Sequence, residues 1–244
     1  LYLLLFLVLF GVIFAKKMNA VPEKNYSSFF LGSFYNSSMS LGVPVFILLF
    51  NENNLAIFFI VLSIMIPLIN LIILTFLKRA KFENESERKN ILSLNFGRIA
   101  FNPIILSCLL GFIFSFFNIK YPSFILNTFS ILSETVVALS LIVIGSSLRF
   151  GHISEYKKEI IISTIFKLIL MPIFAIFVCK FLQIDNATAN VIILYLALPS
   201  ATAGYILASD LGGNSVLLSN VIAVQTLLFS LIIPIIVYIS HLLL

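Results

Sequence analysis

The chain has 244 residues, of which 61% are hydrophobic and only 10% are charged, and its mean hydropathy is +1.14. This composition excludes an ordinary water-soluble domain, in which about a quarter of the residues are charged, and it indicates a membrane protein. The net charge of +5 does not call for a nucleic-acid partner, because the cations fall in short loops between apolar segments, as membrane topology requires.

Long Leu/Ile/Phe runs without strict alternation predict membrane-spanning helices and not the strands of an outer-membrane barrel. The sequence therefore predicts an all-α membrane protein with about eight spans. In chain order, the predicted spans are 1–15, 26–50, 55–77, 99–117, 124–148, 159–182, 187–209 and 215–243.

The first span is unusually short. As a helix its residues rise about 22 Å, against a hydrocarbon core of about 30 Å. The sequence also begins with Leu1 instead of Met, and it lacks the basic region that opens a signal peptide. We therefore expect the sequence to be a fragment that has lost an N-terminal part.

The Lys and Arg residues predict the orientation, because cytoplasmic loops retain cations. Only Lys120 and Lys180 fall in the loops on one side, and Lys167 lies inside a span. The loops on the other side hold Lys16, Lys17, Lys24, Lys78, Arg79, Lys81, Arg88, Lys89, Arg98, Arg149, Lys157 and Lys158. This second side is predicted to be cytoplasmic, so the C-terminus lies outside a plasma or inner membrane.

The longest polar stretch divides the chain into two halves. Residues 78–98 mix cations with glutamates, a pattern that favours a solvated cytoplasmic connector over a lipid-binding segment. The connector separates residues 1–77, the remainder of a first repeat, from residues 99–244, a second repeat with five spans.

Two segments interrupt the apolar spans with small polar residues and a proline, at 36–44 and 197–205. The alternation of spans makes the first broken span run outward and the second run inward. Such a pair of oppositely directed breaks indicates inverted repeats and a binding site of a secondary transporter. The alternative is that both are kinked, tightly packed helices, because Gly, Ser and Pro are common in membrane spans.

Pro44 and Pro199 remove an amide and free backbone groups beside each break. The exposed N-terminal ends of the half-helices would then suit an anion. The polar side chains expected at this site are Asn36, Ser37, Ser38, Ser200, Thr202 and Tyr205, with Asn70 of the next span as a further candidate. Each of them alone is also explained by a hydrogen bond between helices.

Two charged residues inside the later spans need a reason, because a charge in the bilayer is costly. Glu134 and Lys167 are candidates for coupling transport to a proton, although a carboxyl group that is protonated or solvated in a crevice explains Glu134 equally well. A direct ion pair between them would require helix tilt or the reach of the long Lys side chain, since they lie at different depths.

Catalytic motifs are missing from the sequence. It contains no G-x-S-x-G, H-E-x-x-H or Gly-rich phosphate loop, and Cys108 and Cys179 lack the spacing of metal ligands. We therefore expect no enzyme activity, no cofactor and no metal site.

Several motifs in chain order resemble the auxin efflux carrier family, which includes plant PIN carriers and bacterial proteins labelled malate permeases. They are the run 36–44, Asn102-Pro103, Ile144-Gly145-Ser146-Ser147-Leu148, Lys167 with Pro172, and 198–202 followed by Ala208 and Gly212-Gly213. The resemblance implies two inverted five-helix repeats with crossing broken helices, of which this chain holds the third to tenth helices. It also implies that the crossing prolines are Pro44 and Pro199.

The chain departs from the family pattern at both breaks. Members often carry Gly-Asn-Thr-Gly where residues 36–39 read Asn-Ser-Ser-Met, so the family's Asn falls on Ser37. They also often carry Asn where Ala203 stands and Pro where Ala138 stands. These departures affect the expected substrate more than the expected fold.

The sequence thus predicts a secondary-active carrier of small organic anions, such as malate-like or auxin-like carboxylates, that works by alternating access. A sodium-coupled symporter of the bile-acid type is one alternative, and a passive channel or a structural membrane subunit is another. The lipid bilayer is the other expected partner, and a homodimer is left open.

Overall fold

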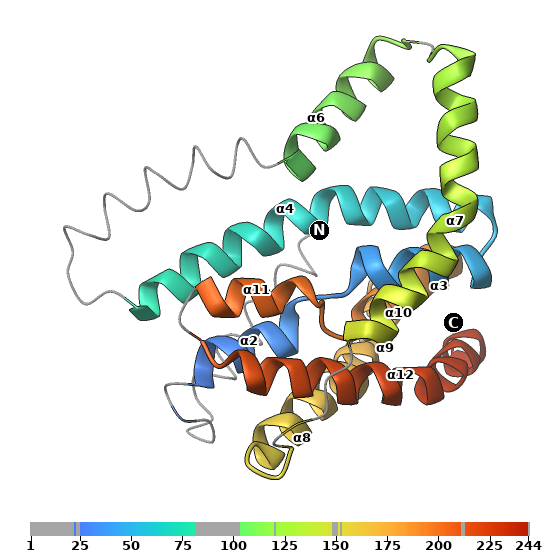
Figure 1. The fold of residues 1–244 in the computed structure, drawn as a ribbon. Coiled ribbons are helices and arrows are strands. Elements are labelled where there is room, and N and C mark those ends of the chain that lie inside the picture. The colour runs from blue at the N-terminus through green and yellow to red at the C-terminus, as the bar shows by residue number, and fades with distance from the viewer. Residues whose placement is uncertain are drawn as a thin grey trace. The chain divides into compact units, whose positions relative to one another are not determined.

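The computed structural model describes residue 22 and residues 25–81, 103–119, 121–147, 151, 153–210 and 213–243. Every regular element in these residues is a helix, which confirms the all-α prediction (Figure 1). The helices are α2 Tyr26–Phe34, η2 Ser38–Gly42, α3 Val43–Leu49, α4 Glu52–Lys81, α6 Pro103–Phe116, α7 Ser123–Ser147, α8 Lys157–Ile165, η3 Phe166–Leu170, α9 Met171–Phe181, α10 Asn186–Ala197, α11 Ala203–Asp210 and α12 Ser215–Leu243.

Within the described residues, the helices lie where the spans from residue 26 onward are predicted, whereas the number of membrane crossings stays a prediction. The η2 and η3 segments are π-helical turns, and η3 joins α8 and α9 into one continuous helix. α4 runs to Lys81, beyond the predicted end at 77. The predicted span 1–15 and residues 82–98 of the predicted connector lie outside the described residues.

The chain forms two compact units. The first contains residues 1–59 and 139–244, and the second contains residues 60–138. The first unit takes residues from both predicted halves, because it holds the elements around both interruptions. The division into compact units does not show whether the chain contains two related repeats. The predicted halves 1–77 and 99–244 therefore stay a prediction.

In the first unit, the short helix α2 packs against α8, α11 and α12 (Figure 1). α10 packs against α9 and α12. A small apolar cluster of Ile160, Leu217 and Val221 joins α8 to α12. Short broken helices are therefore held between long continuous ones.

Side-chain caps and left-handed residues set helix ends in the first unit. The Asp185 carboxylate accepts the Thr188 amide at 2.9 Å and starts α10, and this backbone hydrogen bond lowers the pKa of Asp185. α9 ends before Gln183, which has a φ of 51°. Beyond it the Ile184 amide donates to the Cys179 carbonyl at 3.0 Å, the hydrogen bond of a Schellman cap.

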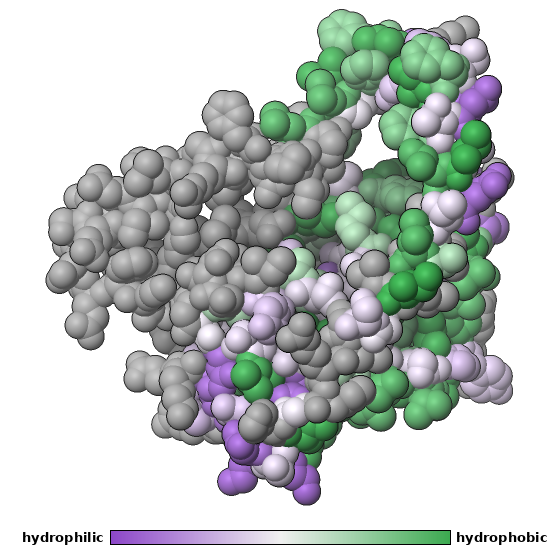
Figure 2. Space-filling model, viewed as in Figure 1, coloured by the Kyte–Doolittle hydropathy of each residue, from purple (hydrophilic) through white to green (hydrophobic). Residues whose placement is uncertain are grey.

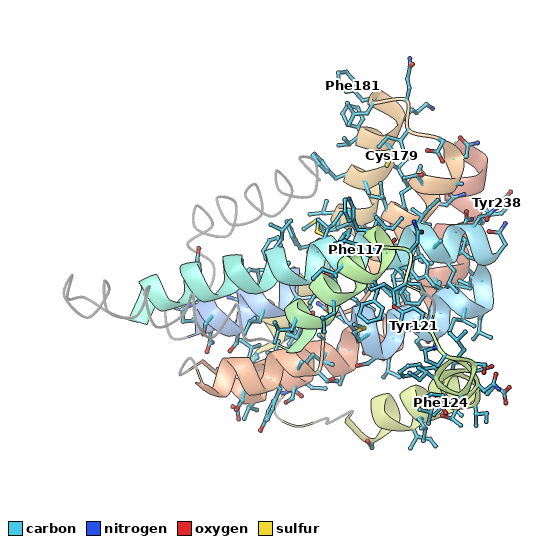
Figure 3. The ribbon with its side chains drawn as sticks, turned by 90° about the horizontal axis from the view of Figure 1, so that it is seen from above. Phe117, Tyr121, Phe124, Cys179, Phe181 and Tyr238 are labelled. Carbon is cyan, nitrogen blue, oxygen red and sulfur yellow. The ribbon has the colours of Figure 1, made fainter. Side chains whose placement is uncertain are left out.

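In the second unit, α6 ends with the same device. Asn118 has a φ of 50°, and the Ile119 amide donates to the Phe114 carbonyl at 3.0 Å. The Phe114 ring stacks on Tyr121, with centroids 5.3 Å apart. Figure 3 labels Tyr121 and Phe117 at the corner between α6 and α7.

Beside an apolar core, the structure exposes many large apolar side chains and buries a group of polar ones. Apolar side chains such as Ile173, Phe177, Phe181 and Leu231 are exposed on α9 and α12. Figure 2 shows apolar residues over much of the coloured part of the surface. Polar side chains are instead buried: Asn25, Ser28, Ser33, Ser37, Ser38, Glu159, Ser163, Thr164, Lys167, Asn190, Ser200, Asn220 and Gln225. An apolar solvent around the helices explains both features.

Two helical stretches in the described part are long and apolar enough to cross a membrane. They are Lys157–Phe181, with 25 residues, and Ser215–Tyr238, with 24 residues. Length and composition alone are weak support, since the buried core helix of a soluble protein has the same properties. The exposed apolar side chains on both stretches strengthen the interpretation.

Gly32 provides a test of this packing. A Cβ at Gly32 would lie 2.9 Å from Val221 Cγ1 and 3.2 Å from Ser163 Oγ, whereas no described atom lies within 4 Å of a Cβ at Gly111. Both Gly→Ala substitutions gain helix propensity. We expect Gly32→Ala to be less stable than Gly111→Ala by about 1–3 kcal/mol, because Val221 is stiff and buried. Thermal unfolding in detergent measures the difference, and equal stability would contradict the close packing.

Candidate functional site

Both predicted interruptions are present. α2 ends at Phe34 and the chain is helical again from Ser38, whereas α10 ends at Ala197 and α11 begins at Ala203. Leu198 has a φ of −55° and a ψ of 138°, because the residue before a proline is driven out of helical geometry. The reading of two continuous kinked helices is therefore wrong.

The two breaks cross each other in antiparallel directions, with Asn36 opposite Ser200. Each break donates one amide to a carbonyl of the other at 2.8 Å: Ser37 to Pro199, and Ala201 to Tyr35. This pairing resembles one rung of an antiparallel sheet. It satisfies the backbone groups that each interruption leaves without a helical partner.

The backbone at the breaks is partly paired. Four amides there are hydrogen-bonded inside the protein: those of Ser37, Ser38, Ser200 and Ala201. The physical reason is that an unpaired amide is costly in an apolar solvent, and the crossing gives each break a partner. These four amides are therefore not free to bind a ligand, which leaves the first amides of the half-helices and nearby side chains.

Asn36 and Lys167 supply such side chains. The Lys167 ammonium, on η3, donates to the Asn36 Oδ1, and the Asn36 Nδ2 donates to the Tyr195 carbonyl at 2.9 Å. Lys167 is 1% exposed, and no described carboxylate lies within ion-pair distance of it. A buried lysine amine thus lies at the crossing with a neutral amide as its partner.

Gln225 holds the second break. Its Oε1 accepts from the Ser200 amide at 2.9 Å and lies 2.6 Å from the Ser200 Oγ. Its Nε2 donates to the Gly32 carbonyl at 2.9 Å and to the Ser163 Oγ at 3.2 Å, and Ser200 Oγ also contacts that carbonyl. Sequence analysis missed Gln225, although an amide side chain within an apolar span was a signal for it.

The other predicted residues of the crossing differ in burial. Ser38 is buried, and its Oγ donates to the Asn36 carbonyl at 3.2 Å. Ser37 is also buried, Thr202 is half-buried and Tyr205 is 39% exposed. Ser37 and Ser38 are therefore buried beside Asn36 at the crossing, whereas Tyr205 is exposed.

Pro44 does not lie in the interrupted residues of the first break, and its place at the crossing, which the family resemblance implies, stays a prediction. It is the second residue of α3, and the π-helical turn η2 immediately precedes this helix. Pro172 follows η3 in the same way. A widened turn relieves the clash between a proline ring and the carbonyl four residues earlier, so the helix continues through Pro44 instead of breaking there.

Two predicted residues lie in the second unit. Asn70 is on α4, and its side chain is outside the described part of the structure. Glu134 is on α7 and is exposed. Their roles in binding and coupling stay predictions.

Comparison with known proteins agrees with this architecture. The profile of a family described as "Membrane transport protein" matches residues 1–237. The "Uncharacterized transporter YfdV" of Escherichia coli K12 is 27% identical over 140 residues, which cover 57% of this chain and 44% of that protein. The YfdV proteins of Escherichia coli O157:H7 and Shigella flexneri match equally well. The chain thus spans less than half the length of these relatives within the match. The family match confirms the resemblance to auxin efflux carriers, and the chain belongs to the membrane transport protein family.

Proposed function

We propose that the protein is a secondary-active carrier of small organic anions, with its substrate site at the crossing of the two broken helices. In this proposal, Lys167 pairs with the carboxylate of the transported acid, and Asn36 holds the ammonium when the site is empty. Ser38 and Tyr195 lie at the same site, since the Ser38 Oγ donates to the Asn36 carbonyl and the Tyr195 carbonyl accepts from the Asn36 Nδ2. The membrane transport family supports a transporter and no enzyme.

The position of Lys167 carries the proposal. Burying an ammonium without a counter-charge costs several kcal/mol, and a neutral amide compensates for only part of this cost. A substrate carboxylate would replace the amide with a charge-assisted hydrogen bond, which is about twice as strong as a neutral one. The crossing is therefore better suited to an anion than to a neutral or cationic solute.

The geometry of the breaks supports alternating access. Their antiparallel directions fit inverted-topology repeats, in which binding at the repeat interface is exposed to each side in turn. We accordingly propose inverted repeats over 1–77 and 99–244, a multi-pass arrangement in a plasma or inner membrane and a C-terminus outside, as the loop cations predict.

Lys167→Met should abolish transport without unfolding the protein. The substitution removes the buried charge and keeps an apolar stem of similar length, so we expect uptake efficiency to fall about 100-fold or more, the loss typical of a broken buried charge pair. The assay is counterflow of radiolabelled malate, indole-3-acetate and other small carboxylates in liposomes made with the full-length protein. A carrier shows stimulation by unlabelled substrate on the opposite side of the membrane, and a pore does not.

Lys180→Met is the matched control, because Lys180 lies in the last turn of α9 and is exposed. It should leave counterflow unchanged. If the wild-type protein takes up substrate but is not stimulated by substrate on the opposite side, this result would contradict a carrier and favour a channel. Full counterflow in Lys167→Met would contradict a role of Lys167 in substrate binding.

Asn36→Asp should inhibit the carrier in a distinctive way. The new carboxylate would pair with Lys167 and compete with the substrate for the ammonium, so we expect a roughly tenfold or larger rise in KM with thermal stability retained or increased. Asn36→Ala lacks that internal competitor and should be less stable than Asn36→Asp. Wild-type KM in Asn36→Asp would contradict the role of Lys167 as the counter-charge of the substrate.

A further inference from the structure

Lys167 is alone as a cation in the interior of a predicted span. Every other Lys and Arg of the sequence falls in a loop or near the end of a span. The structure agrees for the side chains that it describes, since Lys167 is 1% exposed whereas Lys157, Lys158 and Lys180 are exposed. Within the described part, the crossing therefore has a single buried group that can carry a positive charge.

A buried carboxyl group lies on the same continuous helix. Glu159 precedes Lys167 by eight residues, about 12 Å along the helix axis, and is 8% exposed. Its Oε1 accepts from the Asn25 Nδ2 at 3.1 Å, and the Asn25 Oδ1 accepts from the Asn214 Nδ2 at 3.0 Å. Glu159 is thus held by neutral partners at a distance from Lys167. In its ionised form it would repel an additional negative charge at the crossing.

The other described groups near Lys167 are apolar or neutral. The buried rings of Phe34, at the end of α2, and of Phe166, on η3, meet edge to face with centroids 5.2 Å apart. The side-chain donors of Asn36 and Ser38 already bond to protein carbonyls. These surroundings offer no second counter-charge to a ligand.

One carboxylate satisfies such a site, and two do not. A carboxylate beside Lys167 favours the ammonium form of the amine, and the resulting pair carries no net charge. A second carboxylate on the same molecule would be buried without a counter-charge, which is strongly unfavourable in apolar surroundings. The site should therefore separate ligands by their number of charges.

We propose that the crossing accepts one negative charge, so that the carrier transports monocarboxylates and rejects dicarboxylates in their doubly ionised form. This inference rests on the proposed function, in which Lys167 is the counter-charge of the substrate. The selection is made by charge and not by size. An amide in place of the second carboxylate keeps the shape of a dicarboxylate and removes one charge, so the monoamide is accepted where the diacid is not.

Matched compounds test this inference at neutral pH. Two skeletons are used, each as the dicarboxylate, its monoamide and its diamide: succinate with succinamate and succinamide, and terephthalate with its monoamide and diamide. In counterflow with liposomes of the full-length protein, we expect the monoamide of a carried skeleton to have a KM about 100-fold below that of the dicarboxylate, since the dicarboxylate buries an uncompensated charge. The neutral diamide should have a KM at least tenfold above that of the monoamide.

Two variants shift or preserve the number of charges. Asn36→Asp places a carboxylate beside Lys167 and uses its charge inside the protein, so the preference for the monoamide over the diamide should fall at least tenfold. Lys180→Met is the matched control, because Lys180 is exposed at the end of α9, and it should keep the wild-type preference. Thermal unfolding shows that both variants are folded.

The outcomes separate this inference from the carrier function. Equal KM values for the monoamide and the dicarboxylate in the wild type would overturn the selection by charge and leave the carrier function standing. An unchanged preference for the monoamide over the diamide in Asn36→Asp would also overturn it. Absence of counterflow for every carboxylate, indole-3-acetate included, would overturn the carrier function and this inference with it.

Discussion

The fold around the candidate site depends on one constraint, the need to pair backbone amides and carbonyls where a helix is interrupted in an apolar solvent. Two breaks in different parts of the chain solve this problem for each other through the reciprocal bonds of Ser37 with Pro199 and of Ala201 with Tyr35. Neither break would be stable alone in such surroundings. The backbone hydrogen bonds between the breaks therefore fix the position of the crossing. Side chains of the long helices, Lys167 and Gln225, then contact it.

The two breaks are anchored differently. Ser200 is held by Gln225 in a network that also includes Gly32 and Ser163, and all its members are neutral. Asn36 is held by Lys167, whose charge has no described counter-charge. A saturated neutral network favours a rigid anchor, whereas an uncompensated ammonium favours a group that changes partner when an anion arrives. In the proposed carrier, this asymmetry would place the recognition of substrate on the Asn36 side of the crossing.

The π-helical turns provide a second link between local chemistry and function. η2 precedes Pro44 and η3 precedes Pro172, so each widened turn accommodates a proline without ending the helix. The same turns carry Ser38 and Lys167, two side chains that lie at the crossing. If the first proline is taken as the point of interruption, the first break is placed eight residues too late. Asn36, and not Pro44, is the residue that pairs with Ser200 of the other break.

The sequence alone determined the features that follow from local chemistry. Apolar runs specified the helices from residue 26 onward, Pro199 specified the second break through its effect on Leu198, and the small polar run at 36–38 specified the first. Only the tertiary structure decided which groups meet: the amides of one break with the carbonyls of the other, Lys167 with Asn36, and Gln225 with Ser200. These partners are separated by 25 or more residues, as the pairs Lys167–Asn36 (131) and Ser200–Gln225 (25) illustrate. Hydropathy and proline positions describe each helix by itself, and the pairing depends on how the helices pack.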